Sequence, residues 1–133
     1  MKIGDELIGK TFKVTEEKLV AFERVIWHRV ANVHSDKEVA KKVGMSKTIA
    51  SGQNQLAFLH HLMESNFGDG WVRGGKIAAR WVCPVYIGDE ITPCAKVKNL
   101  SELDGKRVAE MEIWCTNQGG VKTALGTAQA YIQ

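Results

Sequence analysis

The chain has 133 residues, of which 44% are hydrophobic and 25% are charged. These values are typical of one globular domain and exclude a disordered, collagen-like or coiled-coil chain. The net charge is only +3, and the sequence contains neither a zinc finger nor an RNA-binding aromatic motif, so a nucleic-acid partner is not indicated. No apolar run approaches the roughly 18 residues of a membrane span, and the N-terminus lacks the pattern of a signal peptide. Three cysteines without a C-x-x-C pair favour reduced thiols in a cytoplasm over disulfides or a metal site.

The first half of the sequence has the periodicity of helices. Thr15 followed by two glutamates is typical of a helix start, and apolar residues at helical spacing predict a helix from about Glu16 to His28. Asp36 predicts the N-cap of a second, short helix, which Gly44 should end.

A third helix is predicted from Gln53 to about Ser65, after Ser51 and Gly52. It carries an apolar stripe at helical spacing, which Phe58 widens. The residues of this stripe are Leu56, Leu59, Leu62 and Met63.

The second half has the period of two that is typical of half-buried strands. Asn117–Gly120 predicts a hairpin turn, and Pro93 indicates an edge strand or a bulge. The predicted strands are Thr11–Val14, Lys76–Val85, Ile91–Leu100, Ala109–Cys115 and Val121–Ile132. This order of elements predicts an α+β domain, in which an antiparallel sheet packs on one face of a central helix. Because the sheet covers only one side of that helix, we expect an exposed face or a dimer.

His34 is the histidine best placed to meet a ligand, because it lies in a short connection between two predicted helices. His60 and His61 are adjacent on the third helix and point about 100° apart, so at most one of them faces a given site. A simpler interpretation of the connection remains open. In that interpretation Asn32 and Asp36 only end and cap helices, and His34 is solvated.

The segment from Phe22 to Ala40 resembles a signature of the MaoC-like dehydratases, also called R-specific enoyl-thioester hydratases, which have the hotdog fold. The signature reads roughly F-x-x-x-[ST]-G-D-x-N-P-x-H-x-D-x-x-x-A. Phe22 opens the segment here, and His34, Asp36 and Ala40 lie at the matching positions.

Two further motifs extend the resemblance to most of the chain, from about residue 9 to residue 132. Gly52 is similar to the family's glycine at the head of its central helix, and Pro84–Asp89 resembles its P-V-x-x-G-D turn. The resemblance implies that residues 1–133 form a single hotdog domain, an antiparallel sheet wrapped around a central helix.

The family's aspartate and histidine hold one water molecule and deliver it across the double bond of an enoyl thioester. At the aspartate position this chain has Arg29, which stays protonated near neutral pH and cannot act as a base. Four explanations remain open. In the first, Asn32 would orient the water, and in the second, Asp36 would replace the aspartate. In the third, a partner hotdog subunit would complete the site, and in the fourth, the reaction would not be hydration.

The resemblance implies that His34 and Gly52 are candidate catalytic residues, and Asn32 is a third because its side chain could orient the water without accepting a proton. Backbone N–H groups at Gly52 would stabilise the charge that a thioester carbonyl gains during the reaction, although this glycine could also serve only the loop-to-helix junction. Coenzyme A would be part of the substrate rather than a cofactor, and its phosphates suit lysine and arginine. The candidate substrate-binding residues are Arg29, Gln53, Lys76 and Arg80, with a solvated cationic face as the alternative for the last two.

The leading hypothesis is a lyase that hydrates enoyl thioesters, or dehydrates 3-hydroxyacyl thioesters, of coenzyme A or a carrier protein. A hotdog thioesterase is an alternative, but its carboxylate is expected on or beside the central helix, where Glu64 lies at the far end. A non-catalytic or half-site subunit of a heteromeric hydratase is the third hypothesis, favoured by Arg29. The expected partner is a second copy of the chain or another hotdog subunit, and neither nucleic acid nor a membrane.

Overall fold

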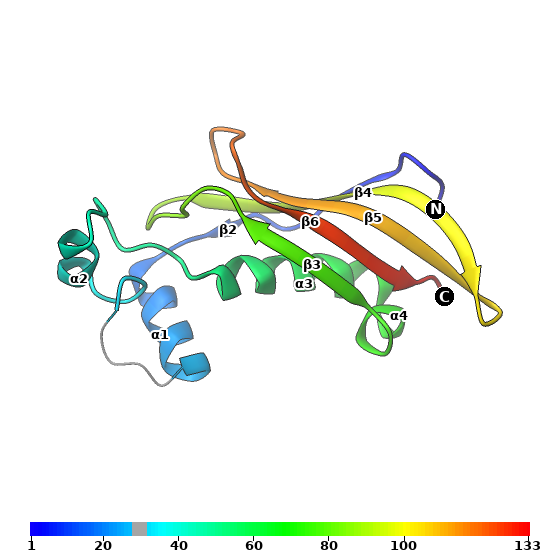
Figure 1. The fold of residues 1–133 in the computed structure, drawn as a ribbon, viewed down its shortest axis with the longest axis horizontal. Helices are drawn as coiled ribbons and strands as arrows, with labels where there is room; N and C mark the ends of the chain where they lie inside the picture. The colour runs from blue at the N-terminus through cyan, green and yellow to red at the C-terminus, as the bar shows by residue number, and fades with distance from the viewer. Residues whose placement is uncertain (28–31) are drawn as a thin grey trace.

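The computed structural model describes residues 1–27 and 32–133. An antiparallel sheet lies over one face of the long helix α3 (Gly52–Phe67), as Figure 1 shows. Helices α1 (Glu16–Trp27) and α2 (Lys37–Lys42) lie beyond the N-terminal end of α3, and the short α4 (Asp69–Val72) follows its C-terminal end. The prediction of an α+β domain with a sheet on one face of a central helix is confirmed.

The sheet has six strands in the order β1-β4-β5-β6-β3, and β2 pairs with β4 outside this path. All of its strand pairs are antiparallel. The strands are β1 (Glu6–Ile8), β2 (Phe12–Lys13), β3 (Lys76–Trp81), β4 (Glu90–Leu103), β5 (Lys106–Thr116) and β6 (Lys122–Tyr131). Within the described part of the chain β3 pairs only with β6, so it forms one edge of the sheet.

The predicted helix boundaries are confirmed to within about two residues. Asp36 caps α2, because its Oδ1 accepts hydrogen bonds from the N–H groups of Glu38 and Val39 at 2.9 and 3.3 Å. Gly44 follows α2 with a φ of +87°, a conformation that favours glycine. Helix α1 is described as far as Trp27, and the predicted terminal residue His28 lies outside the described residues.

Two strand predictions need correction. Strand β1 was not expected, because three residues are too few to show a period of two. The strand predicted to reach Val85 ends at Trp81, since the N–H groups of Val82 and Cys83 both donate to the carbonyl of Thr123, which breaks the ladder.

The prediction that Pro93 marks an edge strand or a bulge is wrong, because β4 has neighbours on both sides and its bulge lies between Val97 and Asn99. Pro93 lies opposite the gap between β1 and β2, where no described strand pairs with it on that side. Its carbonyl accepts from Gly9 N–H at 2.9 Å, so its nitrogen faces the same side, where β1 has ended and β2 has not begun. The missing N–H of proline therefore costs no ladder hydrogen bond.

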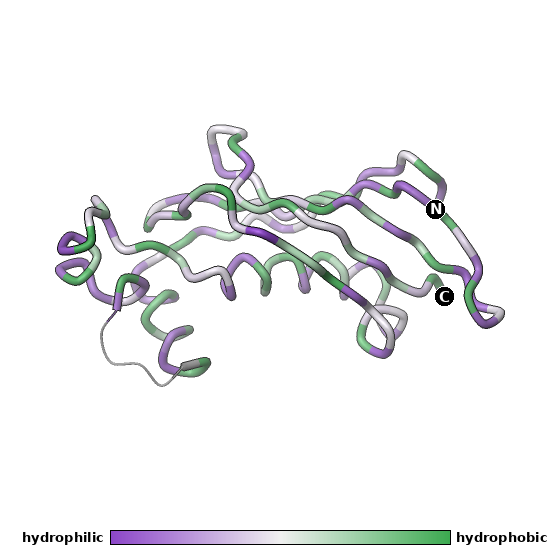
Figure 2. The backbone as a smooth tube through the Cα atoms, in the orientation of Figure 1, coloured by the Kyte–Doolittle hydropathy of each residue, from purple (hydrophilic) through white to green (hydrophobic). Residues whose placement is uncertain are grey.

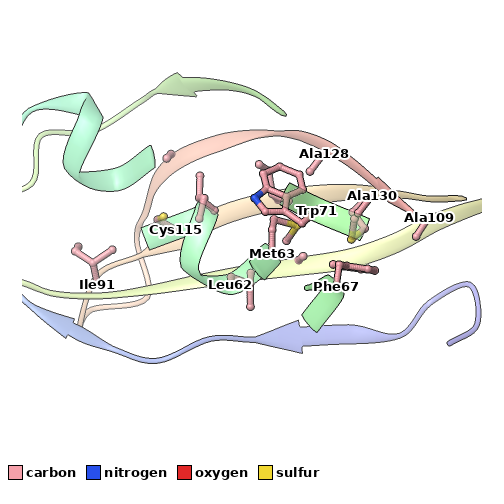
Figure 3. Close-up of a cluster of buried hydrophobic side chains, with 14 of the residues drawn as sticks. Leu62, Met63, Phe67, Trp71, Ile91, Ala109, Cys115, Ala128 and Ala130 are labelled. Carbon is pink, nitrogen blue, oxygen red and sulfur yellow. The ribbon is translucent and has the colours of Figure 1, made fainter. Parts of the chain in front are cut away.

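The core lies between the sheet and the inner face of α3. Figure 2 shows hydrophobic and hydrophilic residues alternating along the turns of α3, which matches its single buried face. Phe67 and Trp71 belong to this core, and the stripe residues Leu59, Leu62 and Met63 are fully buried. Figure 3 shows side chains of α3 and α4 packed with those of the strands, among them Ile91, Ala109, Cys115, Ala128 and Ala130.

We predict that the three free thiols react at very different rates with Ellman's reagent at about pH 8. Cys115 is buried in β5, and burial raises its pKa to about 12, so its thiolate is scarce. Burial also raises the pKa of Cys94, whereas Cys83 is only partly buried. We expect Cys83 to react first and Cys115 only after unfolding. The variant Cys83→Ser should lose the fast phase, and fast labelling of Cys115 in the folded chain would contradict the described packing.

Candidate active site

The loop that carries His34 is organised by the side chain of Asn32. Its Oδ1 accepts from His34 N–H at 2.8 Å, and its carbonyl accepts from the N–H groups of Ser35 and Asp36 at 3.1 and 2.9 Å. Ser35 Oγ in turn accepts from Asn32 N–H at 3.3 Å. Asn32 and His34 are therefore joined by a hydrogen bond through the backbone N–H of His34.

In the described part of the chain, the imidazole of His34 is held by one backbone carbonyl. Its Nδ1 lies 3.0 Å from the carbonyl oxygen of Ile49. A carbonyl can only accept, so Nδ1 carries the hydrogen of the neutral ring. This leaves the lone pair on Nε2, the atom that can take a proton from a ligand.

Residues 48–50 connect this loop to the sheet and to α3. Ile49 N–H donates to the carbonyl of Val33 at 3.1 Å, and Ala50 N–H donates to the carbonyl of Val85 at 2.7 Å. Ile49 also forms an antiparallel bridge with Tyr86. Since α3 begins at Gly52, the histidine loop is held by Ile49, three residues before the helix start.

Gly52 lies against the indole of Trp81. A Cβ atom at this position would overlap Trp81 Nε1, so the close approach requires glycine. Trp81 is the last residue of β3 and 45% of it is exposed, which places its ring over the start of α3 rather than in the core. The periodicity of β3 alone did not indicate the contact of Trp81 with Gly52.

The N–H groups of Gly52 and Gln53 open α3 without an acceptor within the helix, as at any helix start. The N–H of Asn54 already donates to the carbonyl of Ser51 at 3.0 Å. Gln53 is exposed beside them on the first turn. Asn54 is buried and donates from Nδ2 to Ser51 Oγ at 3.1 Å, so it supports the turn instead of facing solvent. A carbonyl oxygen at this end of the helix would meet N–H donors and the positive end of the helix dipole.

Lys76 and Arg80 lie on the face of the sheet that points away from α3. Their strand neighbours Ile77 and Ala79 pack against the core, so the two cations share the opposite, exposed face. They line a hollow of about 1050 Å³ together with Lys98, Glu110 and Glu112. The hollow is of mixed charge and lies on the other side of β3 from Gly52, while Arg29 lies outside the described residues.

Sequence reasoning missed two buried oxygen-bearing residues near the loop. Glu23 is 0% exposed, its Oε2 accepts from Asn32 Nδ2 at 3.4 Å, and its Oε1 has no partner among the described residues. Thr48 is 1% exposed, and its Oγ1 likewise has none within residues 1–27 and 32–133. Glu23 follows the buried Leu19 by one helical turn, so the helical period could have indicated that its carboxyl points inward.

The other histidines and Glu64 lie away from this loop. His60 Nδ1 accepts from Trp71 Nε1 at 3.2 Å, and the ring of His61 meets the ring of Phe12 edge-on. Glu64 is exposed near the end of α3, about 18 Å along the helix from Gly52 at the usual rise per residue. In the described residues no group of three or more histidine, cysteine or acidic side chains could hold a metal, and no described helix is long and apolar enough to cross a membrane.

Comparison with known proteins places these features in a wider context. A profile of the MaoC-like domain matches residues 2–119. None of the curated proteins matches the chain.

Several solved structures share the fold over nearly the whole chain. The monoamine oxidase regulatory protein of Archaeoglobus fulgidus is 27% identical, with a TM-score of 0.84 over 99% of this chain and 90% of that one. The R-hydratase PhaJ1 of Pseudomonas aeruginosa is 23% identical, with a TM-score of 0.82 over 99% of this chain and 82% of that one. The ChsH1-ChsH2 complex of Mycobacterium tuberculosis is 15% identical, with a TM-score of 0.80 over 100% and 99%. The antiparallel sheet around α3 is therefore the hotdog fold.

We predict that Gly52→Ala displaces the indole of Trp81. The added methyl group overlaps the ring, but the half-exposed ring can turn toward solvent, so the free energy of unfolding should fall by only about 1 kcal/mol. The tryptophan emission should shift to longer wavelength. The same change in a Trp81→Phe background serves as the control and should leave the emission unaltered. An unchanged spectrum of Gly52→Ala would show that Trp81 does not cover the start of α3.

Proposed function

This chain belongs to the MaoC-like domain family, and from that premise we propose that it is a hydratase or dehydratase of enoyl or 3-hydroxyacyl thioesters. One observation carries the proposal. The ring of His34 is fixed to Ile49, on the same short segment that leads into α3 at Gly52. The imidazole of His34 and the N-terminus of α3 are thus both held by the segment of residues 49–52. The solved R-hydratase of the same fold supports the proposal by the reaction that its name states.

In the proposed reaction, water adds across the double bond of the enoyl thioester. His34 Nε2 takes a proton from the water as the water oxygen bonds to C3, and the electron pair of the double bond moves toward the thioester carbonyl. N–H groups at Gly52 stabilise the negative charge on that oxygen. The imidazolium then returns its proton to C2, which restores the neutral ring and completes the addition.

The proposed substrate includes a coenzyme A or carrier-protein group. Gln53, exposed on the first turn of α3, is the substrate-binding candidate nearest to the helix start. Lys76 and Arg80 can meet a phosphate only on the outer face of the sheet, where Glu110 and Glu112 also lie. Their binding of coenzyme A, like that of Arg29, remains a prediction.

A half-site subunit is the second candidate function, and a specific observation favours it. Arg29 stands where the family signature has its aspartate, so a partner with that aspartate could complete the reaction. The ChsH1-ChsH2 complex, which has two different subunits, supports this candidate at the level of the fold. The thioesterase alternative is less well supported, because Glu64 is exposed at the far end of α3.

We predict that the purified chain removes the conjugated-thioester absorbance of at least one member of a panel of enoyl-CoA esters. His34→Ala should lower kcat by about 10²-fold or more, since the proposed proton carrier is lost. His61→Ala is the matched control, because this exposed histidine lies about 14 Å along α3 from Gly52 and should leave kcat unchanged. Full activity in His34→Ala would overturn the proposed site.

We further predict that the chain forms at least a dimer through the free edge of β3. Among the described residues β3 pairs on one side only, so its other side offers N–H and C=O groups that two copies can satisfy by antiparallel pairing. The exposed side chains of Val72, Trp81 and Val82 on or beside β3 add apolar area for such a contact. Sedimentation at micromolar concentration should give at least twice the chain mass of 14.7 kDa. A clean monomer would contradict this interface.

A further inference from the structure

Glu23 is a buried acidic residue whose carboxyl group contacts the loop of His34. It is 0% exposed on the inner side of α1, where an acidic side chain loses its hydration and needs hydrogen bonds in return. Only Oε2 has a partner among the described residues, the Nδ2 of Asn32 at 3.4 Å. Among the described residues, the hydrogen bond of this buried side chain therefore goes to the loop of His34.

The carboxamide of Asn32 connects the side chain of Glu23 to the backbone of His34. Its carboxamide is planar, with donors on nitrogen and acceptors on oxygen. When Nδ2 donates to Glu23 Oε2, Oδ1 lies where it accepts His34 N–H at 2.8 Å. A flipped carboxamide would place Oδ1 against the carboxyl oxygen and NH₂ against the N–H group, so both hydrogen bonds would be lost. Glu23 thus favours the same orientation of Asn32 that the shorter bond from His34 N–H requires.

The backbone and the ring of His34 are then fixed by different parts of the chain. Asn32 holds the N–H group, and the carbonyl of Ile49 holds Nδ1 at 3.0 Å. Both anchors are needed to fix where Nε2 points. Because reacting groups must lie within a fraction of an ångström of their best positions, loosening one anchor lowers the rate without removing the imidazole.

We propose that Glu23 is a positioning residue for His34, acting through Asn32. This inference rests on the hydratase function proposed above. Glu23 would provide a carboxyl group beside a loop in which residue 29 is an arginine. Glu23 touches neither water nor substrate in this role. It works as an outer partner that orients the proton-exchanging group.

The test compares Glu23→Leu, Glu23→Gln and the control Glu17→Leu. Glu23→Leu removes the acceptor for Asn32 and should lower kcat by about 10- to 100-fold, with KM changed by less than about threefold. Glu23→Gln keeps an acceptor oxygen and should retain kcat within about threefold of the wild type. Glu17 is exposed on the same helix, so Glu17→Leu should have no effect. If Glu23→Gln is as slow as Glu23→Leu, the carboxyl group itself is required and the positioning role is overturned.

A double-mutant cycle tests whether Glu23 acts through Asn32. Asn32→Ala should already lose the anchor, so adding Glu23→Leu to it should change kcat by less than about twofold. If the kcat of the double variant instead falls by the product of the two single losses, Glu23 acts by another route and the proposal is overturned.

Amide hydrogen exchange of His34 separates this inference from the proposed function, because it needs no activity. In the wild type the His34 N–H is bonded to Asn32, and in Glu23→Leu and Asn32→Ala its exchange should be at least about tenfold faster. Glu17→Leu should match the wild type. If no thioester is hydrated but these rates change as stated, the proposed function fails and the link from Glu23 to His34 stands. Unchanged exchange of His34 in Glu23→Leu overturns the link even in an active enzyme.

Discussion

Backbone pairing of residues 48–50 is the constraint on which the candidate site depends. The N–H of Ile49 bonds to Val33 on one side, and the N–H of Ala50 bonds to Val85 on the other. A hydrogen bond of this kind contributes about 1 kcal/mol of net stability, but leaving its buried groups unpaired costs more. The segment is therefore fixed between the histidine loop and the turn before β4, and it delivers Ser51 and Gly52 to the start of α3.

Small side chains on β6 allow this strand to lie close to both α3 and β3. Along β6 the residues that face the helix are Ala124, Gly126, Ala128 and Ala130. At Gly126 a Cβ atom would overlap the carbonyl of Ala78 in β3, so the edge strand can pair here only with a glycine. Two residues beyond this close pairing, Trp81 pairs with Ala124, and its indole lies against Gly52.

The two faces of the sheet have different chemistry. The inner face is apolar and packs on α3, whereas the outer face carries Lys76, Arg80 and Lys98 beside Glu110 and Glu112. Lys98 Nζ lies 3.8 Å from Glu112 Oε2, and both side chains are largely solvated, so this pair contributes little stability. The outer face can attract an anionic group only in competition with its own acidic residues.

Local patterns in the sequence were sufficient for the elements and for part of the site. The cap at Asp36, the turn at Asn117–Gly120 and the alternation along β5 depend on neighbours in the chain, so they could be predicted. The resemblance that singled out His34 and Gly52 is also a matter of residue types and spacing. The even spacing of Lys76 and Arg80 predicted a shared face, although not which face.

Only the tertiary structure decided how these residues are held. The contact of His34 with Ile49 spans fifteen positions, and that of Gly52 with Trp81 joins a helix start to an edge strand. Glu23 reads in the sequence as one more acid on an amphipathic helix, and it becomes a buried partner of Asn32 only when α1 packs beside the loop. Periodicity describes which side of an element is apolar. It cannot specify which distant group that side will meet, because that choice is made by the packing of the whole chain.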